Sequence, residues 1–333
     1  MNGIRQNNKM VKITSFPRIH ITLIGMNNDG YRINGSIGFS ITSPKIEIRF
    51  VVSDIVEVID QREIKFSKDE KIRLQNLILS IAINLGFKEN FKCIIQSNAL
   101  PHHGLGSNTA IYMSCIEALF IINNAEYTSA DIVYYSKRGG TSGVGINTYF
   151  EGGFIFDVGI KNYEQLFIPS SIADRRGNIP LVIHKCKLPN WEIGICIPRY
   201  IKNKSEQEEI DFFKSNCPID RAFVEKILYE AVYGITSSII ENDYDIFCKS
   251  INTIQSTQWK YLERSLYGKE LIELEHKIKS CGADCVGMSS LGPVLFFVGK
   301  NINDIITQIN SDIPNATCYS TSLNNEGRIV YYD

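Results

Sequence analysis

The stretch Pro101-His-His-Gly-Leu-Gly-Ser-Asn-Thr-Ala110 decides how the rest of this chain is interpreted. It lies between FKCIIQS (91–97), a predicted strand, and IYMSCIEALFIINN (111–124), a predicted apolar helix. Its glycines let the backbone approach a ligand closely, and its Ser-Asn-Thr run falls where the helix begins. Unpaired backbone N–H groups and the helix dipole favour an anion at such a position. The segment predicts a phosphate-binding loop, with a plain strand-to-helix turn capped by serine as the alternative. It is not a Walker A loop, because GxxxxGK[ST] is absent.

The elements around this loop indicate a mixed α/β first part. IEIRFVV (46–52) alternates like a half-buried strand, and Ser67-Lys-Asp-Glu70 has the spacing of a capping box that begins a helix. That helix is expected to end at Gly86, and a second, capped by Thr128, at 138–140. Aromatic and β-branched residues predict a hairpin over 147–159. The other strands are expected at 13–23, 35–41, 181–189 and 191–199, and a long loop at 161–180.

The second part of the chain indicates an α+β domain. Its charged segment 202–214 is interpreted as a solvated loop or the start of a helix. Helices are expected at 219–241, 243–264, 268–280 and 302–310, and strands within 285–300, 316–323 and 327–333. Because 333 residues exceed one ordinary core, we divide the chain into two domains, 1–188 and 189–333.

Composition excludes several classes of function. Lys and Arg total 35 against 36 Asp and Glu, so no overall basic field exists to bind nucleic acid. Nine cysteines without a secreted framework indicate reduced thiols and a cytoplasmic protein. Neither a signal-peptide core at residues 1–10 nor an apolar run of membrane-spanning length is found. HExxH and GxSxG are absent, which argues against a zinc protease and a serine hydrolase.

Three further segments carry patterns typical of ligand binding. Arg138-Gly-Gly-Thr-Ser-Gly-Val-Gly145 surrounds one cation with glycines and hydroxyls, which favours a second anion site or a glycine-rich connection under a sheet. Gly287-Met-Ser-Ser-Leu-Gly-Pro293 is either a loop that meets the phosphate site or a tight hairpin turn. Arg18 and His20 alternate on a strand and share a face, as a ligand wall or as a surface strand.

PHHGLGSNTA and GMSSLGP together resemble the second and third motifs of the GHMP superfamily of small-molecule kinases. The closer resemblance is to one branch, the β-ribofuranosylaminobenzene 5′-phosphate synthases. It is carried by FPRIHITLIGMNNDGYRINGSIGFSI, LPHHGLGSNTA, KRGGTSGVGINTYFEGGFIFDVG, FIPSS…PLVIHKCKLPNWEIGICIP and GMSSLGPVLFFV, in order over most of the chain. The resemblance implies an α+β fold of two domains, one like domain 2 of ribosomal protein S5 and one ferredoxin-like.

This resemblance implies a glycosyltransferase that joins the phosphoribosyl group of PRPP to an aromatic acid such as 4-aminobenzoate. The ring carbon that bears the carboxylate attacks ribose C1, and pyrophosphate and CO2 leave. Mg²⁺ is the implied cofactor and a homodimer the implied assembly. Methanopterin biosynthesis uses such an enzyme, and related synthases of C-nucleoside pathways use heteroaromatic acids.

An ATP-dependent GHMP kinase and a non-catalytic ligand sensor are the alternatives. In mevalonate-type kinases the pattern SGVDN supplies an aspartate near the phosphoryl acceptor. Here the run is Ser142-Gly-Val-Gly-Ile146, with Gly145 in the place of that aspartate. A kinase without this carboxylate loses its acceptor activation, whereas a carbon nucleophile needs no such base.

The chemistry assigns expected roles to particular residues. The 104–109 loop with Mg²⁺ is expected to hold pyrophosphate, and Arg18, His20 or Arg138 the carboxylate or the ribose phosphate. Asp157 is the predicted ligand of magnesium or of ribose hydroxyls, and Ser170 and Ser171 are predicted to close over phosphate. The remaining predicted substrate-binding residues are Arg32, Asn34, His102, His103, Gly104, Leu105, Gly106, Ser107, Asn108, Thr109, Gly139, Gly140, Thr141, Ser142, Gly143, Ser289 and Ser290.

Overall fold

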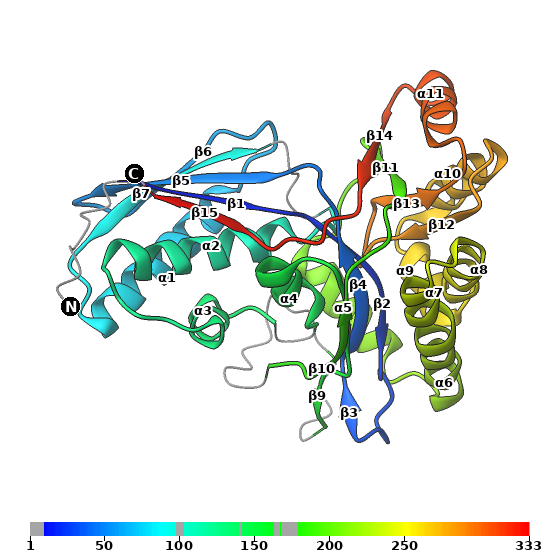
Figure 1. Ribbon diagram of the computed structural model, residues 1–333, viewed down its shortest axis with the longest axis horizontal. Coiled ribbons are helices and arrows are strands. Elements are labelled where there is room, and N and C mark those ends of the chain that lie inside the picture. Colours follow the sequence, from blue (N-terminus) through cyan, green and yellow to red (C-terminus); the bar gives the residue numbers. More distant parts are fainter. Residues whose placement is uncertain (1–9, 98–102, 140–141, 163–166, 168–178, 333) are drawn as a thin grey trace.

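A computed structural model describes residues 10–97, 103–139, 142–162, 167 and 179–332. Figure 1 shows a long sheet with helices beneath it at one end, a second sheet through the middle, and a helix-rich region with a third sheet at the other end. No helix in these described ranges is long and apolar enough to span a bilayer.

The first sheet has the order β15-β1-β5-β7-β6 and packs on the apolar helix α2. All its pairs are antiparallel except β6 with β7. Thirteen of the 16 residues of α2 are buried, because the sheet and neighbouring helices cover it on several sides. The elements are β1 (Met10–Ser15), β5 (Ile46–Ser53), β6 (Glu57–Asp60), α1 (Lys68–Leu85), β7 (Asn90–Ser97), α2 (Ser107–Ile122), α3 (Ser129–Ser136) and β15 (Ile329–Tyr332).

The middle sheet, β10-β8-β4-β2, connects the two ends of the molecule. Its buried residues belong to the same apolar cluster as helices of the second half, among them Phe39 against Phe247 and Phe296. Its elements and the small sheet beside it are β2 (Arg18–Ile24), β3 (Arg32–Ile33), β4 (Gly35–Ser40), α4 (Val144–Glu151), β8 (Phe154–Asp157), β9 (Ile160–Lys161) and β10 (Val182–Cys186).

The third sheet, β12-β13-β11-β14, is covered on both faces. Successive residues of β13 alternate between two clusters, since Phe296 faces the middle of the molecule and Phe297 faces α10 and α11. The elements are β11 (Glu192–Pro198), α5 (Glu206–Asn216), α6 (Arg221–Tyr229), the π-helical η1 (Glu230–Thr236), α7 (Ser237–Glu241), α8 (Tyr244–Gln255), α9 (Gln258–Ser265), α10 (Gly268–Ser280), β12 (Cys285–Met288), β13 (Leu295–Val298), α11 (Ile302–Asp312) and β14 (Ala316–Ser322).

Three local predictions are wrong. The helix expected over 243–264 is two helices, α8 and α9, separated at Ser256 and Thr257. The strand expected over 13–23 is two strands in different sheets, because Pro17 has no N–H to continue a ladder. The hairpin expected over 147–159 is instead α4 followed by β8. Val144, Ile146 and Tyr149 are buried on α4, so packing overrides the β propensity of its aromatic residues. The segment 202–214, by contrast, does contain a helix start, because α5 begins at a capping box formed by Ser205 and Glu208.

The last strand returns to the beginning of the fold. β15 pairs antiparallel with β1, with Ile13 opposite Val330. Arg328 donates hydrogen bonds of 2.5–3.1 Å to the buried carboxylate of Glu117 on α2. The end of the chain is therefore built into the first sheet, and the domain boundary at residue 188 stays a prediction.

Candidate active site

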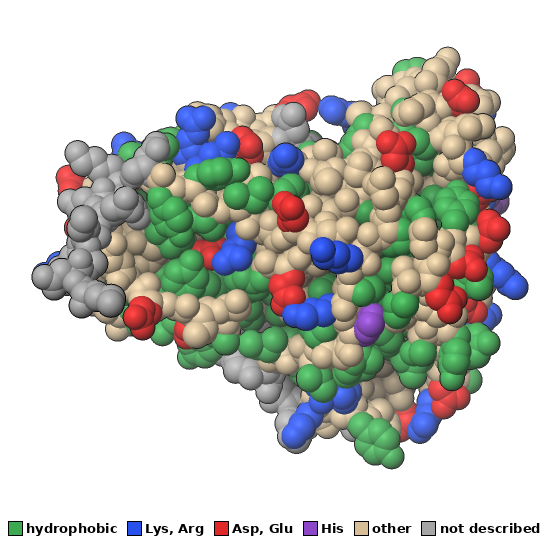
Figure 2. Space-filling model, viewed as in Figure 1, with side chains coloured by type: hydrophobic (Ala, Val, Ile, Leu, Met, Phe, Trp, Pro, Cys, Tyr) green, Lys and Arg blue, Asp and Glu red, His purple; other side chains and the backbone are tan. Residues whose placement is uncertain are grey.

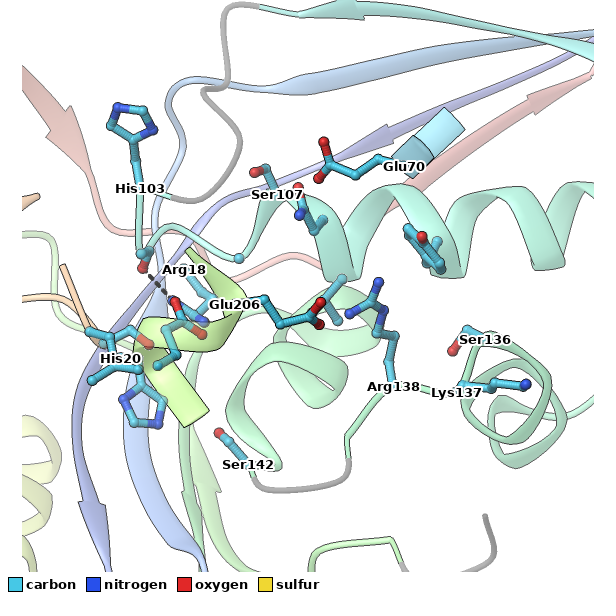
Figure 3. Close-up of a pocket in the computed structure, with 18 of the residues that line it drawn as sticks. Arg18, His20, Glu70, His103, Ser107, Ser136, Lys137, Arg138, Ser142 and Glu206 are labelled. Atoms are coloured by element: carbon cyan, nitrogen blue, oxygen red, sulfur yellow. Dashed lines mark hydrogen bonds between the residues drawn. The ribbon is translucent and has the colours of Figure 1, made fainter. Parts of the chain in front are cut away.

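A cavity of about 780 Å³ lies where the first and middle sheets meet the second half of the chain. Its walls come from β2, the loop 103–109, α1, the end of α3, α5 and the loop 290–292. Figure 3 shows side chains from these separate segments pointing into one space. Segments distant in the sequence thus meet at the predicted phosphate loop.

The loop 104–109 forms one wall of the cavity through Gly104, Gly106, Ser107, Asn108 and Thr109. Gly104 and Gly106 have φ of 79° and 77°, where a side chain is strained. Gly106 is the N-cap of α2, and no side chain caps the helix. The start of α2 therefore directs the positive end of the helix dipole at the cavity. The geometry suits a phosphate.

Arg18 lies directly against this loop. Its Nη1 donates to the carbonyl oxygen of Gly104 at 2.5 Å, and its backbone N–H donates to that of Leu105 at 3.0 Å. A Cβ at Gly106 would lie 3.0 Å from Arg18 Cγ, so glycine gives the guanidinium its place. Burial lowers the pKa of Arg18 to about 10, which leaves it charged at neutral pH. Its Nε has no partner among the described residues, so Arg18 retains a donor for an anion.

The loop after β12 meets the phosphate loop, as one of the two interpretations of 287–293 requires. Ser289 Oγ donates to the carbonyl of Gly104 at 2.7 Å and accepts from the backbone N–H of His20 at 3.1 Å. The backbone N–H of Ser290 donates to the carbonyl of His20 at 2.9 Å. Ser289 is buried behind the wall, whereas Ser290 lines the cavity. The loop therefore fixes β2 and the phosphate loop to each other.

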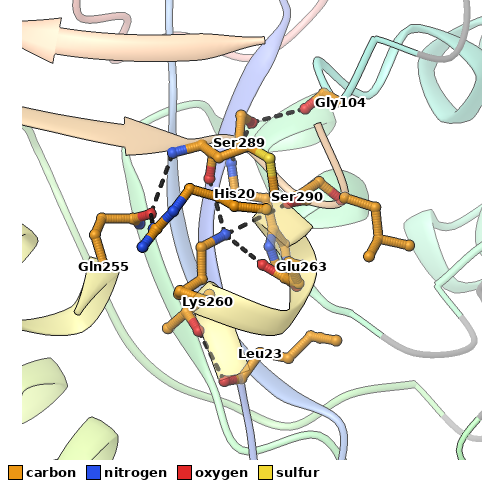
Figure 4. A network of polar contacts seen from close by, with 12 residues as sticks. His20, Leu23, Gly104, Gln255, Lys260, Glu263, Ser289 and Ser290 are labelled. Atoms are coloured by element: carbon orange, nitrogen blue, oxygen red, sulfur yellow. Dashed lines mark hydrogen bonds and ion pairs between the residues drawn. The ribbon is translucent and has the colours of Figure 1, made fainter. Parts of the chain in front are cut away.

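A buried ion pair contacts the loop after β12 (Figure 4). Lys260 Nζ lies 2.5 Å from Glu263 Oε2 and donates to the carbonyl of Met288 at 2.9 Å. Both side chains are buried, and Glu263 borders the cavity. Burial lowers the pKa of Lys260 and raises that of Glu263, while each opposes the shift of the other. Lys260 is therefore placed to position the loop.

His20 is buried and borders the same cavity as Arg18, as their alternation on one strand predicts. Burial, together with the charges of Arg18 and Lys260, lowers the pKa of His20 well below its usual value. The imidazole is thus uncharged at neutral pH. It can exchange hydrogen bonds with a ligand but does not supply the positive charge expected for an anion clamp.

Arg138 forms a second cationic corner. Its guanidinium lies 3.9 Å from the ring centroid of Tyr112, a cation–π contact that orients its plane. Burial lowers its pKa, and the nearby carboxylate of Glu206 opposes this shift. Arg138 Nε has no hydrogen-bond partner within the part of the chain that the structure describes. The next residue, Gly139, has φ of 83°, and a Cβ there would lie 2.8 Å from Cδ1 of Ile146.

Asp157 lies behind the cavity wall. Its carboxylate accepts hydrogen bonds from Ser36 Oγ at 2.5 Å and from the N–H groups of Gly143 and Gly159 at 3.1 and 2.9 Å. Burial raises its pKa to about 7, and these hydrogen bonds oppose the shift. Ser36 also pairs with Ser142, which does line the cavity. This geometry fits a residue that positions the segment around Gly143 rather than a metal ligand.

The other predicted residues divide between the cavity, its surroundings and undescribed segments. His103 lines the cavity with its Nδ1 3.1 Å from Asn203 Nδ2, and Leu105 is in the core. Arg32 donates to the carbonyls of Val158 and Gly159 and, like the buried Asn34, is absent from the lining. His102, Gly140, Thr141, Ser170 and Ser171 lie outside the described residues.

Sequence reasoning missed a set of cavity residues, most of them on helices. Tyr112, Glu206, Phe213, Glu263 and Leu291 line the cavity from elements far apart in the chain. Glu206 had one usable signal, since 202–214 is unusually charged, but that pattern is also typical of a solvated helix. Within the described ranges, no three His, Cys, Asp or Glu side chains are grouped as a metal site.

Three curated proteins are similar to this chain, and each is named beta-ribofuranosylphenol 5′-phosphate synthase. That of Methanothermobacter thermautotrophicus is 30% identical over 285 residues, which cover 84% of this chain and 86% of the relative. That of Methanocaldococcus jannaschii is 30% identical over 296 residues, with 85% and 87% covered. That of Archaeoglobus fulgidus is 29% identical over 292 residues. No model of a protein family matches the chain.

Solved structures with a similar fold include homoserine kinases, a mevalonate kinase and mevalonate diphosphate decarboxylases. Homoserine kinase from Cytophaga hutchinsonii superposes with a TM-score of 0.70 over 99% of this chain and 100% of its own, at 16% identity. Mevalonate kinase from L. major gives 0.68 over 98% and 100%, at 13% identity. Likeness at such identities concerns the fold alone, and it confirms the predicted α+β GHMP fold.

Proposed function

The chain belongs to the family of the beta-ribofuranosylphenol 5′-phosphate synthases, and we propose that it transfers a phosphoribosyl group from PRPP to an aromatic acid with loss of CO2 and pyrophosphate. The relatives are named for a phenol product, whereas the motif resemblance names an aminobenzene. We therefore take 4-hydroxybenzoate and 4-aminobenzoate as the first acceptors to test.

The observation that carries this proposal is the environment of Gly145. A Cβ there would lie 3.7 Å from Thr109 Cγ2 and 3.8 Å from Arg18 Nε. Where mevalonate-type kinases carry an aspartate to activate an alcohol, this chain has a glycine beside a guanidinium. A cation at that point suits an anionic donor and an anionic acceptor, and it removes the base that a kinase needs.

The described residues suggest how each reactant is held. We propose that pyrophosphate binds the N–H groups of the 104–109 loop and Arg18, since this wall combines helix dipole, backbone donors and a buried cation. Arg138 would hold the second anionic group, because a guanidinium oriented by Tyr112 is suited to bidentate contact. The ring carbon would attack ribose C1 on the face opposite to pyrophosphate.

Mg²⁺ fits this arrangement, because it prefers one or two carboxylates together with substrate phosphates. Glu206 lines the cavity and offers carboxylate oxygens. When bound, the ion would neutralise charge on the leaving pyrophosphate. Asp157, with its carboxylate engaged by three protein donors, is not proposed as a ligand.

The test is incubation of the protein with Mg-PRPP and a panel of benzoates and heteroaromatic acids, with measurement of pyrophosphate and CO2. Equal amounts of both products, lost on chelation of Mg²⁺, are expected for one acid class. Pyrophosphate without CO2 would contradict the decarboxylative reaction, and turnover only with heteroaromatic acids would indicate a C-nucleoside-forming synthase. ATP consumption with a small alcohol would instead favour a kinase. The homodimer and the cytoplasmic location stay predictions of the sequence.

A further inference from the structure

Three charged side chains from separate segments meet in the cavity. Arg73 lies on α1, Arg138 directly after α3 and Glu206 at the start of α5, and all three line the cavity. Nη1 of Arg73 lies 3.8 Å from Oε2 of Glu206. Figure 3 shows the Glu206 carboxylate directed toward the guanidinium of Arg138. The second half of the chain thus places one carboxylate against two arginines of the first half.

These charged groups are accessible, and their mutual contact is weak. The side chains of Arg73 and Glu206 are 62% and 43% exposed, and an exposed ion pair contributes at most about 1 kcal/mol. Arg138 is half-buried and is held over the ring of Tyr112. Burial lowers the pKa of Arg138, and the charge of Glu206 opposes this shift whereas that of Arg73 adds to it. A stronger anion can therefore replace Glu206 at the two arginines.

The position of the two arginines relative to the phosphate loop suits a donor with an anionic group at each end. Arg138 is held over Tyr112, which lies five residues after Ser107, the first residue of α2. Five residues correspond to about 7.5 Å along a helix axis. PRPP carries its pyrophosphate and its 5-phosphate on one ribose unit. A donor with its pyrophosphate at the start of α2 therefore brings its 5-phosphate within reach of Arg138.

Two arginines suit the 5-phosphate better than the carboxylate of the acceptor. A phosphate monoester carries about −1.5 to −2 charges at neutral pH and three acceptor oxygens, whereas a carboxylate carries one charge. A strong clamp on the carboxylate would also stabilise the substrate before CO2 leaves, which opposes the reaction. Outside the cavity, Figure 2 shows acidic and basic side chains interspersed over one face of the molecule. Selection between these anions therefore depends on the cavity itself.

Resting on the proposed function, we propose that Arg73 and Arg138 together bind the 5-phosphate of PRPP, and that Glu206 occupies their site while the donor is absent. Arg73 is then a substrate-binding residue outside the glycine-rich motifs. Binding of the donor exchanges a contact of Arg73 with a carboxylate for one with a phosphate, and no covalent bond changes. The displaced Glu206 carboxylate becomes available for the ligand role proposed above.

Calorimetric titration with PRPP and with pyrophosphate, both in the presence of Mg²⁺, tests the role of Arg73. Pyrophosphate lacks the 5-phosphate, so it reports on the phosphate loop alone. In Arg73→Gln the Kd for PRPP should rise about tenfold, while the Kd for pyrophosphate stays unchanged. Because Arg73 is mostly exposed, the substitution should not disturb folding.

Lys71→Gln is the matched control for Arg73→Gln. It removes one positive charge from the same helix, but two residues of separation direct Lys71 about 200° away from Arg73, and Lys71 is absent from the cavity lining. Both Kd values should stay at those of the wild type. Equal losses of PRPP affinity in the two variants would show only a general effect of charge and would overturn the assignment of Arg73.

Glu206→Gln tests the second part of the proposal. With EDTA in place of Mg²⁺ and titration to millimolar PRPP, loss of the resident carboxylate should lower the Kd about threefold, and Arg73→Gln in the same chain should cancel this gain. An unchanged or higher Kd would overturn the placement of Glu206.

Three other results would overturn the assignment of Arg73 to the 5-phosphate. They are an unchanged Kd for PRPP in Arg73→Gln, an equal rise in the Kd for pyrophosphate, and a loss of affinity for 4-hydroxybenzoate alone. Failure of the wild type to bind PRPP in the presence of Mg²⁺ would instead refute the proposed function.

Discussion

Alanine at Gly104 should loosen the contact between the phosphate loop and the loop after β12. The added Cβ would lie 2.3 Å from the carbonyl oxygen of Ser289, a backbone atom that cannot rotate away. The residue also has φ of 79°, which costs an alanine about 1–2 kcal/mol. Overpacking adds about 1–3 kcal/mol. Gly86→Ala is the matched control, because Gly86 has φ of 68° and nothing within 4 Å of the added atom.

The two variants therefore share the backbone strain and differ in the clash. Urea unfolding should show a loss for Gly104→Ala that exceeds the loss for Gly86→Ala by about 1–3 kcal/mol. Because the carbonyl of Gly104 also accepts from Arg18, its displacement should raise the KM for PRPP about tenfold, or about 1.4 kcal/mol. The control should leave this KM unchanged. Equal stability losses with equal KM values would refute the assignment of the two loops to one rigid site.

Three further substitutions test other parts of the site. Arg138→Lys keeps the charge but loses the planar stack, so kcat/KM should fall at least about tenfold in steady-state assays, and an unchanged value would remove Arg138 from the site. Asp157 has a folded pKa of about 7, above its usual value near 4, so its contribution to stability should decrease as pH rises from about 4 to 7. Urea midpoints at pH 5 and 8 should therefore differ less in Asp157→Asn than in the wild type, and equal pH dependence would contradict the raised pKa. Lys260→Met should cost about 3–5 kcal/mol by leaving Glu263 buried without its partner, and adding Glu263→Leu should restore much of the unfolding midpoint, whereas no recovery would show that the pair is not coupled.

The sequence predicts local elements well where the chemistry of a few adjacent residues decides them. The capping boxes at Ser67 and Thr128 form as expected, with each side chain accepting from the third helical residue. The strand-to-helix change around Gly106 is equally local. The failure over 147–159 has a different cause, because Tyr149 prefers a strand by itself but is buried on a helix, with its hydroxyl donating to Glu117 at 2.7 Å. Contacts distant in sequence decide such cases.

The same distinction between local chemistry and contacts distant in sequence decides which features of the site can be predicted. Arg18 and His20 are predictable as a pair, because two-residue spacing on a strand puts them on one face. Their charge states cannot be predicted from the sequence, because the pKa of His20 depends in part on Lys260, 240 residues further along the chain. Asp157 is predicted as a ligand because a carboxylate at a strand end is chemically suited to a metal or to ribose hydroxyls, and that prediction stays untested. Only the hydrogen bonds from Ser36 and Gly143 reveal that its oxygens are already engaged.

The net charge of the chain is near zero, but positive and negative side chains occupy different places in the cavity. Arg18 and Arg138 lie where anionic groups are proposed to bind, and the Glu263 carboxylate borders the cavity with Lys260 as its counterion. A kinase needs a carboxylate beside its acceptor alcohol. This chain has Gly145 at that position, and a Cβ there would lie 3.8 Å from Nε of Arg18. The new nucleophile is a ring carbon, whose electrons must come from the opposite side of the ring. A nucleophile of this kind needs no carboxylate at position 145, so a cation beside the phosphate loop is compatible with the proposed reaction.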